Sequence, residues 1–465
     1  MIKKEILEKV LSVALSTGGD FAEIFAEHTT ANSLNLVNKR IEEIASSTIS
    51  GAGIRVFLGC RSVSASTTDM TESGLIRCAR SVADIIASGK EEISINLTRS
   101  IPMNIHPIRM VPSSVAKSKK AEILKTACGG AYDKSNEIMQ VSGSIYDNDH
   151  EILIANSEGL LISDRAIRTR LSVTAISERG DNRQSGFYGP GARRGIELFD
   201  MIDPKSVGEE AARIALVKLD AKPCPAGKMT VAIENGFGGV IFHEACGHSL
   251  EATSVAKNSS QMAGKLGMKI ANEKVTAIDD GTLPGEWGSL NIDDEGTPAR
   301  RNVLIEKGVL KSYMIDKLNG RRMGMPVTGN SRRQNYTYEP TSRMTNTFIC
   351  NGDDKNEDII ASIEYGLLAN KMGGGSVNPI NGTFNFAVAE GYIVRNGKIC
   401  EPVLGASLIG NGADILMNID MVGQNLAHGQ GMCGSSSGSV FNNVGQPLIR
   451  VSSITVGGSA DKADK

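Results

Sequence analysis

The residues best suited to chemistry lie in one short segment, where two of the six histidines flank a glutamate. The segment reads His243-Glu244-Ala245-Cys246-Gly247-His248. Metallopeptidases use His-Glu-x-x-His on a helix, where the four-residue step puts both imidazoles on one face to bind zinc and the glutamate acts as a base. The segment therefore indicates a metal site with His243 and His248 as ligands and Glu244 as the group that activates a water.

The spacing of the two histidines is one residue longer than in that motif. Five residues of a regular α-helix turn through about 500°, which would place His248 about 140° away from His243. A π-bulge or a bend at Gly247 would correct the mismatch, because a bulge adds a residue to one turn and glycine tolerates unusual backbone angles. We therefore predict a distorted helix at 243–248. The alternative is a pair of helix histidines that pack without a metal.

A catalytic zinc also needs a third protein ligand and a position left open for water. Glu251 lies three residues after His248, and Cys246 lies inside the motif at a spacing that would strain a site. Cys433 lies in a glycine-rich segment far along the chain that could reach the metal, and His428 is a further candidate. A thiolate binds zinc well and must lose its proton to do so. Residue types and spacing leave this choice open.

The rest of the chain must fold so that these residues meet. Apolar residues at helical spacing predict helices over 2–17, 71–88, 114–130, 205–218 and 357–369. Alternating or continuous apolar runs predict strands over 21–28, 33–37, 53–58, 62–66, 138–146, 152–156, 160–165, 168–177, 229–233, 302–306, 309–315 and 384–394. Because helices and strands do not alternate regularly, the predicted fold class is α+β rather than a doubly wound sheet.

Proline-containing stretches divide the chain. The segment 97–113 carries Pro102, Pro107 and Pro112 and has the character of a linker, and a second boundary falls at Lys222–Gly227. A chain of 465 residues is long enough for roughly three domains. We predict an N-terminal helix-strand-helix unit at 1–95, a middle α+β unit at 96–222 and a C-terminal domain at 223–465 that carries the metal site.

Composition excludes several classes of function. The 50 basic and 52 acidic side chains give a net charge of −2, which argues against a nucleic-acid-binding surface spread over the whole protein. The N-terminus lacks the apolar core of a signal peptide, and no stretch approaches the ~18 apolar residues of a membrane span. The eight cysteines are scattered without a CxxC pair, which favours a reducing cytoplasm. We expect a cytoplasmic protein that binds neither nucleic acid nor membrane.

Beyond this segment, the sequence resembles the TldD/PmbA family over nearly its whole length, and in particular the TldD-type members that carry a metal. The resemblance rests on several segments in a fixed order: His243–His248, Asp293–Pro298, Arg343–Thr347, Gly373–Val377, Phe384–Phe386 with Glu390–Tyr392, and Gly431–Gly434.

The resemblance implies a cytosolic zinc peptidase with an elongated His-Glu-x-x-x-His motif. It also implies that the third ligand is a cysteine of the C-terminal domain, which matches Cys433, so that Glu251 and Cys246 take supporting roles. It further implies a partner subunit. TldD-type subunits pair with a TldE/PmbA-type paralogue without the metal motif, and a homodimer is the alternative. The resulting chamber admits unfolded or short peptides.

Substrate-binding residues are predicted from the matching segments. Arg343 and Tyr392 are candidates for contacting substrate, and Gly374 and Gly375 for binding an extended peptide by strand addition. The rival interpretation is a non-catalytic subunit that binds peptides or supports assembly and keeps its metal for structure. A fourth protein ligand would favour this rival, because structural zinc sites are closed, whereas an open position favours the peptidase.

Overall fold

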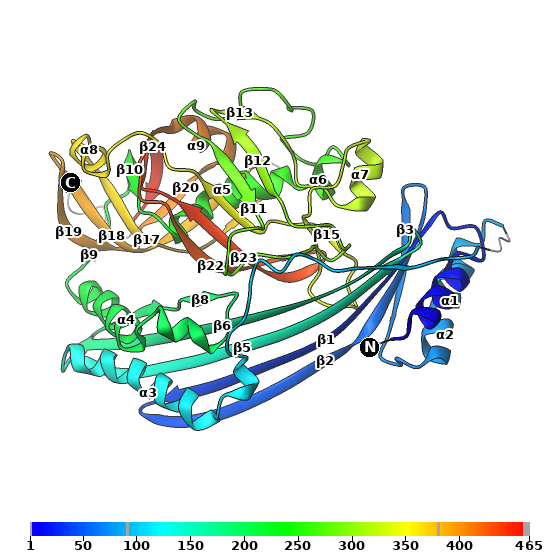
Figure 1. Cartoon of the computed structure of the whole chain (residues 1–465). Coiled ribbons are helices and arrows are strands. Elements are labelled where there is room, and N and C mark those ends of the chain that lie inside the picture. Colours follow the sequence, from blue (N-terminus) through cyan, green and yellow to red (C-terminus); the bar gives the residue numbers. More distant parts are fainter. Residues whose placement is uncertain (1, 90–92, 379–381, 459–465) are drawn as a thin grey trace.

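The computed structural model describes residues 2–89, 93–378 and 382–458. A long, curved sheet carries a C-terminal domain on one face, with one pair of helices at each end of the sheet (Figure 1). Helices and strands follow one another without regular alternation, which confirms the predicted α+β class. No helix in the described part of the chain is long and apolar enough to cross a membrane.

The long sheet has the strand order β3-β2-β1-β5-β6-β4, and β7 and β8 pair with β6. Neighbouring strands are antiparallel except for the parallel pair β4 and β6. The strands are β1 (Phe21–Val37), β2 (Arg40–Leu58), β3 (Arg61–Thr67), β4 (Thr98–Ser100), β5 (Ile138–Asn156), β6 (Leu160–Arg179), β7 (Asn182–Tyr188) and β8 (Gly191–Ala192).

Several strands predicted as separate are parts of longer ones. Separate strands were predicted over 138–146 and 152–156, but β5 runs continuously through both. The intervening polar residues look like a turn, yet they pair with β1 on one side and β6 on the other. The Asp147 carboxylate accepts hydrogen bonds from Lys120 Nζ at 2.7 Å and Asn32 Nδ2 at 2.8 Å. These partners satisfy a buried charge that local sequence patterns cannot reveal.

Two helix pairs cover the ends of this sheet. Helices α1 (Lys4–Leu15) and α2 (Glu72–Ile86) pack together at one end, and α3 (Lys117–Lys134) and α4 (Pro204–Leu219) at the other, with η1 (Pro112–Ser114) and η2 (Ile196–Asp200) in the connections (Figure 1). Strands from both predicted N-terminal units, 1–95 and 96–222, share the one sheet. The three-unit division itself stays a prediction.

The C-terminal domain contains two larger sheets. In the first, the order is β17-β10-β24-β20-β18-β19-β9, β21 pairs with β24, and an additional β17–β18 pairing closes part of it into a ring. Its strands are β9 (Lys222–Pro223), β10 (Gly227–Ile233), β17 (Tyr365–Val377), β18 (Thr383–Arg395), β19 (Lys398–Leu404), β20 (Ser407–Asn411), β21 (Ile419–Val422) and β24 (Ile449–Gly457).

The second sheet has the order β13-β12-β11-β16-β23-β22, so β22 is an edge strand. Its strands are β11 (Ala277–Asp280), β12 (Arg301–Glu306), β13 (Val309–Leu310), β16 (Asn346–Ile349), β22 (Ala427–Ser435) and β23 (Gly438–Gln446). The two-stranded sheet of β14 (Ser331–Arg332) and β15 (Thr341–Ser342) lies beside it. The short helices of the domain are η3 (Phe237–Gly239), α5 (Val240–Ala245), η4 (Gly247–Leu250), α6 (Ala252–Val255), α7 (Lys317–Met323), α8 (Asn356–Ala361) and α9 (Gly412–Asn418).

The helix predicted over 357–369 is wrong in its second half. Helix α8 ends at Ala361, and β17 begins at Tyr365. The apolar run that extended the prediction, Gly366–Ala369, is buried between β10 on one side and β18 on the other. A strand buried on both faces is continuously apolar, so periodicity cannot distinguish it from a buried helix.

A buried ionic junction joins the long sheet to the C-terminal domain. Arg55 of β2 lies 2.5 Å from the Glu295 carboxylate, and Glu23 of β1 lies 2.7 Å from the Arg333 guanidinium. Burial would raise the pKa of Glu23, but Arg55 and Arg333 outweigh burial and lower it. All four side chains are almost fully buried. Removing one of them would leave its partner as an unpaired buried charge, which is strongly destabilising.

The contact between α3 and α4 gives a test of this packing. A Cβ added at Gly208 of α4 would lie 1.8 Å from the Ala127 carbonyl oxygen of α3, whereas a Cβ at Gly129 would meet nothing within 4 Å. We expect Gly208→Ala to destabilise the fold by about 1–3 kcal/mol through overpacking. Gly129→Ala, the control, should stabilise it by about 0.5–1 kcal/mol through helix propensity. Chemical denaturation measures both, and equal stabilities would contradict the close approach.

Candidate metal centre

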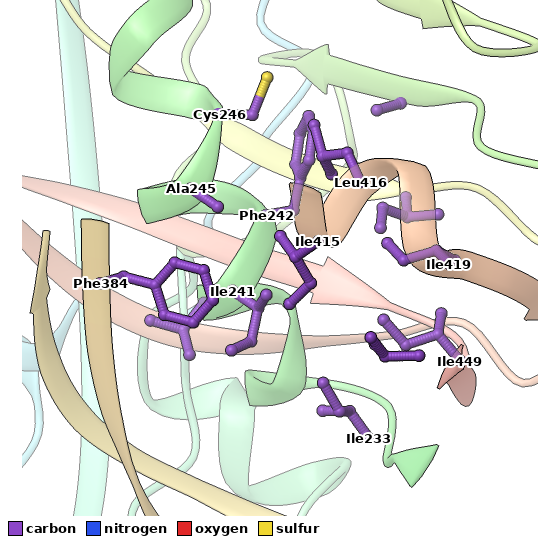
Figure 2. Close-up of a cluster of buried hydrophobic side chains, with 14 of the residues drawn as sticks. Ile233, Ile241, Phe242, Ala245, Cys246, Phe384, Ile415, Leu416, Ile419 and Ile449 are labelled. Carbon is purple, nitrogen blue, oxygen red and sulfur yellow. The ribbon is translucent and has the colours of Figure 1, made fainter. Parts of the chain in front are cut away.

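The first half of the motif lies on α5, which the core of the C-terminal domain holds in place. Ile241, Phe242 and Ala245 are buried in one hydrophobic cluster with Ile415 and Leu416 of α9 (Figure 2). Strands β10, β18 and β24 add Ile233, Phe384 and Ile449 to this cluster (Figure 2). Because α5 is only six residues long, this packing rather than intrinsic helix propensity fixes the direction of His243.

The chain breaks between the two histidines. Helix α5 ends at Ala245, the next residue, Cys246, has backbone angles of φ −134° and ψ −42°, and a 3₁₀ segment begins at Gly247. The predicted distortion is present, but as a break at Cys246 rather than a π-bulge. Gly247 is needed for a close approach, since a Cβ there would lie 2.4 Å from the Met344 sulfur. The break brings the rings of His243 and His248 to a centroid distance of 4.9 Å, nearly perpendicular at 86°.

Cys433 completes the cluster from the edge strand β22. Its Sγ lies 3.3 Å from Nε2 of His243 and 3.3 Å from Nε2 of His248. The three donor atoms all lie within 4.8 Å of one another. The structure thus brings together the two histidines of the motif and the cysteine that the family resemblance pointed to.

The electrostatics of the cluster favour a thiolate. Burial alone would raise the pKa of the Cys433 thiol, but the charges and hydrogen bonds of the two imidazoles outweigh it and lower this pKa to about 4. Burial would lower the pKa of His248, yet Glu251 and Cys433 raise it well above its usual value. The thiolate is the form of cysteine that binds a divalent metal.

Two further residues orient the imidazoles. The Glu251 carboxylate lies 3.2 Å from Nδ1 of His248, and the Asn442 amide lies 3.3 Å from Nδ1 of His243. The Asn442 atom nearest Nδ1 is the amide nitrogen, and the amide oxygen is buried without a hydrogen-bond partner among the described residues. A 180° rotation of the amide would let that oxygen accept a hydrogen bond from Nδ1 of His243. Both Nε2 atoms then face Cys433. The arrangement at His248 is typical of metal-binding histidines, whose second nitrogen donates to a carboxylate or carbonyl.

The donor set therefore fits a divalent metal. Two imidazoles and a thiolate are ligands that zinc prefers, and their supporting hydrogen bonds are present. Glu244 lies beside them, with Oε2 at 3.7 Å from Nε2 of His248, and its side chain is 22% exposed. A carboxylate in this position can reach both the cluster and solvent.

The other ligand candidates lie outside the cluster. Cys246 is fully buried in the hydrophobic core, where burial raises the pKa of its thiol to about 12. His428 is on β22, five residues before Cys433. Its ring centre lies 5.1 Å from that of Phe348, and its Nδ1 lies 3.7 Å from the Glu286 carboxylate. Glu251 orients His248 instead of joining the donor group. Asn442 was missed, since a lone asparagine in a strand gives no signal in the sequence.

The predicted substrate-binding residues are scattered. Arg343 is fully buried beside the cluster, where it donates to the Cys433 carbonyl oxygen at 2.5 Å. Tyr392 donates to Glu390 at 2.7 Å, within a group that includes Arg213 of α4. Gly374 and Gly375 lie exposed on β17. Contact of these residues with a substrate stays a prediction.

Comparison with known proteins decides the family. Models of the PmbA/TldA metallopeptidase match three parts of the chain: domain 1 at residues 22–86, the central domain at 111–219 and the C-terminal domain at 226–458. The chain belongs to the PmbA/TldD metallopeptidase family. The cluster of His243, His248 and Cys433 lies wholly within the C-terminal metallopeptidase domain of this family.

Relatives across bacteria and archaea carry metalloprotease names. A metalloprotease TldD homolog of Haemophilus influenzae is 37% identical over 95% of this chain and 93% of its own. A TldD homolog of Buchnera aphidicola from Acyrthosiphon pisum is 34% identical with the same coverage. A zinc metalloprotease TldD homolog of Saccharolobus solfataricus is 27% identical over 97% of this chain and 99% of its own. These names associate the family with proteolysis and a metal ion.

Solved structures show the same fold. A Thermotoga maritima protein has a TM-score of 0.80 at 22% identity, covering 98% of this chain and all of the other. TldE from Thermococcus kodakarensis has a TM-score of 0.77 at 20% identity, covering 97% of this chain and all of the other. The arrangement of the long sheet and the C-terminal domain is therefore shared by distant sequences.

The two cysteines of the region can be separated by metal analysis. We expect Cys433→Ala to lose bound metal, because it removes one of three donors. Cys246→Ala should retain metal, since Cys246 faces the hydrophobic core, and should cost only about 1 kcal/mol of stability. Elemental analysis of the purified variants measures both. Metal retained in full by Cys433→Ala would remove this residue from the ligand set.

Glu251 should tune metal affinity without being a ligand. Glu251→Gln removes the charge that orients His248 and leaves the buried Arg343 without its carboxylate neighbour at 3.6 Å. We expect a loss in metal affinity of about 10–100-fold, as for other residues that orient metal-binding histidines. Competition with a chromogenic chelator gives the affinity, and Glu273→Gln, at an exposed position, is the matched control. Equal affinities of the two variants would argue against the orienting role.

Proposed function

We propose that the protein is a zinc-dependent peptidase that hydrolyses unfolded or short peptides. The observation that carries the proposal is the convergence of His243, His248 and Cys433 from separate elements, with the partly exposed Glu244 beside them. The metalloprotease names of relatives that match nearly the whole chain support the same assignment.

His243, His248 and Cys433 would hold the zinc. Bound there, zinc supplies Lewis-acid chemistry, since it lowers the pKa of a coordinated water and polarises a carbonyl oxygen. The residues of the chain prepare the site for it. The two imidazoles keep Cys433 deprotonated, and Glu251 and Asn442 leave both Nε2 atoms directed at the thiolate.

Glu244 is the proposed general base. Its carboxylate follows His243 directly in sequence and lies on the side of His248 that faces the cluster, 3.7 Å from Nε2. From this position it would take a proton from the attacking water and later deliver that proton to the leaving amine. Partial exposure of Glu244 gives water a route to the carboxylate.

The edge strand β22 is the proposed platform for the peptide. It lies at the edge of its sheet, paired with β23, and also forms an isolated bridge between His428 and Gly236. Trp287 and Arg343 donate to the carbonyl oxygens of Gly431 and Cys433, but among the described residues no further strand pairs with β22 beside Cys433. An extended peptide that adds to this edge would be recognised through its main chain, which suits broad specificity. Gly374 and Gly375 on β17 remain a second candidate for such pairing.

Three protein ligands favour a catalytic site over a purely structural one. Structural zinc sites are closed by four protein ligands, and the donor group within the described residues contains three. The structural likeness to TldE supports assembly with a TldE/PmbA-type subunit, with a homodimer as the alternative. Such an assembly would limit access to the edge of β22 and so favour unfolded or short peptides.

Glu244→Gln tests the mechanism directly. We expect peptide hydrolysis to fall by about 10²–10⁴-fold, because the variant keeps the shape of the side chain but cannot accept a proton. Metal content should be unchanged, since Glu244 is not among the three donors. Cleavage of an unfolded peptide, followed by mass spectrometry with and without a chelator, measures the effect against Glu273→Gln. Full activity of Glu244→Gln would exclude this mechanism.

A further inference from the structure

A cavity of about 60 Å³ lies at the junction of the long sheet and the C-terminal domain, away from the three metal-binding side chains. Strands β5 and β6 form one side, and residues 290–294, 332–334 and 439–441 form the other. We call it the arginine cavity, because it is lined by the buried arginines Arg168, Arg193, Arg332 and Arg333. One buried water needs only about 10–15 Å³, so a group of several atoms fits.

Two of these arginines have no carboxylate partner within the described ranges. Arg168 donates to the backbone oxygens of Trp287 at 2.8 Å and Ser289 at 3.2 Å. Arg332 donates only to two backbone oxygens, those of Met344 and Phe441. Their exposed fractions are 2% and 4%, so solvent screens neither charge well.

The other two arginines are neutralised. Arg193 pairs with Asp164 at 3.2 Å, and Arg333 pairs with Glu23 at 2.7 Å. The second carboxylate of the lining, Asp294, accepts the backbone N–H of Arg333 at 2.7 Å and forms no ion pair within 4 Å among the described residues, although its charge offsets part of the burial of Arg332. Four arginines thus face two carboxylates in the lining. The lining of the arginine cavity therefore keeps an excess of positive charge.

That excess is energetically costly. Burial lowers the pKa of Arg168 well below its usual value, and the nearby charges of Arg193 and Arg332 lower it further. A guanidinium nevertheless stays protonated in proteins. A buried charge without a partner destabilises the fold, and an anion placed beside it removes that cost.

The remaining walls suit a short carbon chain. Ile152, Leu290 and Ile292 are buried apolar residues of the lining, and the Arg168 guanidinium stacks 4.7 Å from the centre of the Phe441 ring. The exposed members of the lining, Gln334 and Ser439, lie at the solvent side, next to the turn between β22 and β23.

We propose that the arginine cavity binds a carboxylate of a peptide, carried by an acidic side chain or by the carboxyl terminus. Val440 of the lining pairs directly with Cys433 in the antiparallel β22–β23 hairpin, so the cavity is one strand away from the metal cluster. The cavity thus selects peptides with a carboxylate close to the bond that is cut, a role that rests on the proposed peptidase function.

Binding can be measured without catalysis, because Trp287 is the only tryptophan of the chain. Its ring lies 5.0 Å from that of Phe441, and its backbone oxygen accepts from Arg168. Three probes are titrated into the full-length protein: N-acetylglutamate amide, N-acetylalanine and N-acetylglutamine amide. The first carries a side-chain carboxylate, the second a terminal carboxylate and the third no charge. We expect a saturable change in fluorescence with one or both of the first two and none with the third, and the probe that binds shows which kind of carboxylate the cavity takes. No saturable change with either carboxylate overturns the proposal.

A variant at the entrance keeps the test independent of folding. Ser439→Asp places a negative charge at an exposed position of the lining and should weaken carboxylate binding about tenfold or more, whereas Ser439→Asn should not. Arg168→Gln should abolish binding, with Arg165→Gln, exposed on the same strand, as its control. Equal affinities of Ser439→Asp and Ser439→Asn would overturn the proposal even if Arg168→Gln fails to fold.

The two proposals fail separately. Cleavage of a peptide with a glutamate near the cut bond is compared with that of its glutamine counterpart, in the wild-type protein and in Ser439→Asp. Probe binding without any hydrolysis would count against the peptidase alone. Hydrolysis without probe binding and without preference for glutamate would count against the carboxylate subsite alone.

Discussion

One buried guanidinium supports the whole cluster of His243, His248 and Cys433. Arg343 donates to the Cys433 carbonyl oxygen and to Ser437 and Gly438 at the turn of the β22–β23 hairpin. Its Nε also lies 3.6 Å from Glu251, which in turn orients His248. A rigid, planar group with several donors can hold such separate elements in one geometry. The distance between the imidazoles and the thiolate therefore depends on a residue that is not itself a metal ligand.

The acidic segment Asp293-Asp294-Glu295 shows how sequence motifs outside the metal site contribute. Asp293 accepts backbone N–H groups of its own loop, Asp294 accepts that of Arg333, and Glu295 pairs with Arg55 of the long sheet. Burial raises the pKa of all three carboxyls, so each relies on these partners. The segment docks the C-terminal domain onto the sheet, and the same docking forms the arginine cavity.

The sequence predicted the parts of this structure that are encoded locally. Helices α1, α2 and α4 follow from apolar residues at helical spacing, and the need for a distortion between His243 and His248 follows from helix geometry. The length of β5 did not, because the charge of Asp147 is satisfied by Lys120 from another element. Cys433 could be chosen as third donor only through family resemblance, since spacing alone left four candidates. Asn442 and the arginine cavity depend on tertiary packing and had no signal in the sequence, and the spacing of the histidines predicted a distortion but not that it would be a break at Cys246.

The three donor residues of the cluster come from different elements, because the chain breaks at Cys246 and Cys433 lies on an edge strand. Its donors come from α5, η4 and β22, and 185 residues separate His248 from Cys433. An unfolded chain cannot keep three such donors together, so an ion held by them would bind the native state almost exclusively. At free ion concentrations a thousandfold above its dissociation constant, it would add about 4 kcal/mol to the free energy of unfolding. The stability of the folded domain would then depend on the free metal concentration around it. When the metal is scarce, more of the protein would unfold, so the amount of folded protein would fall together with its activity.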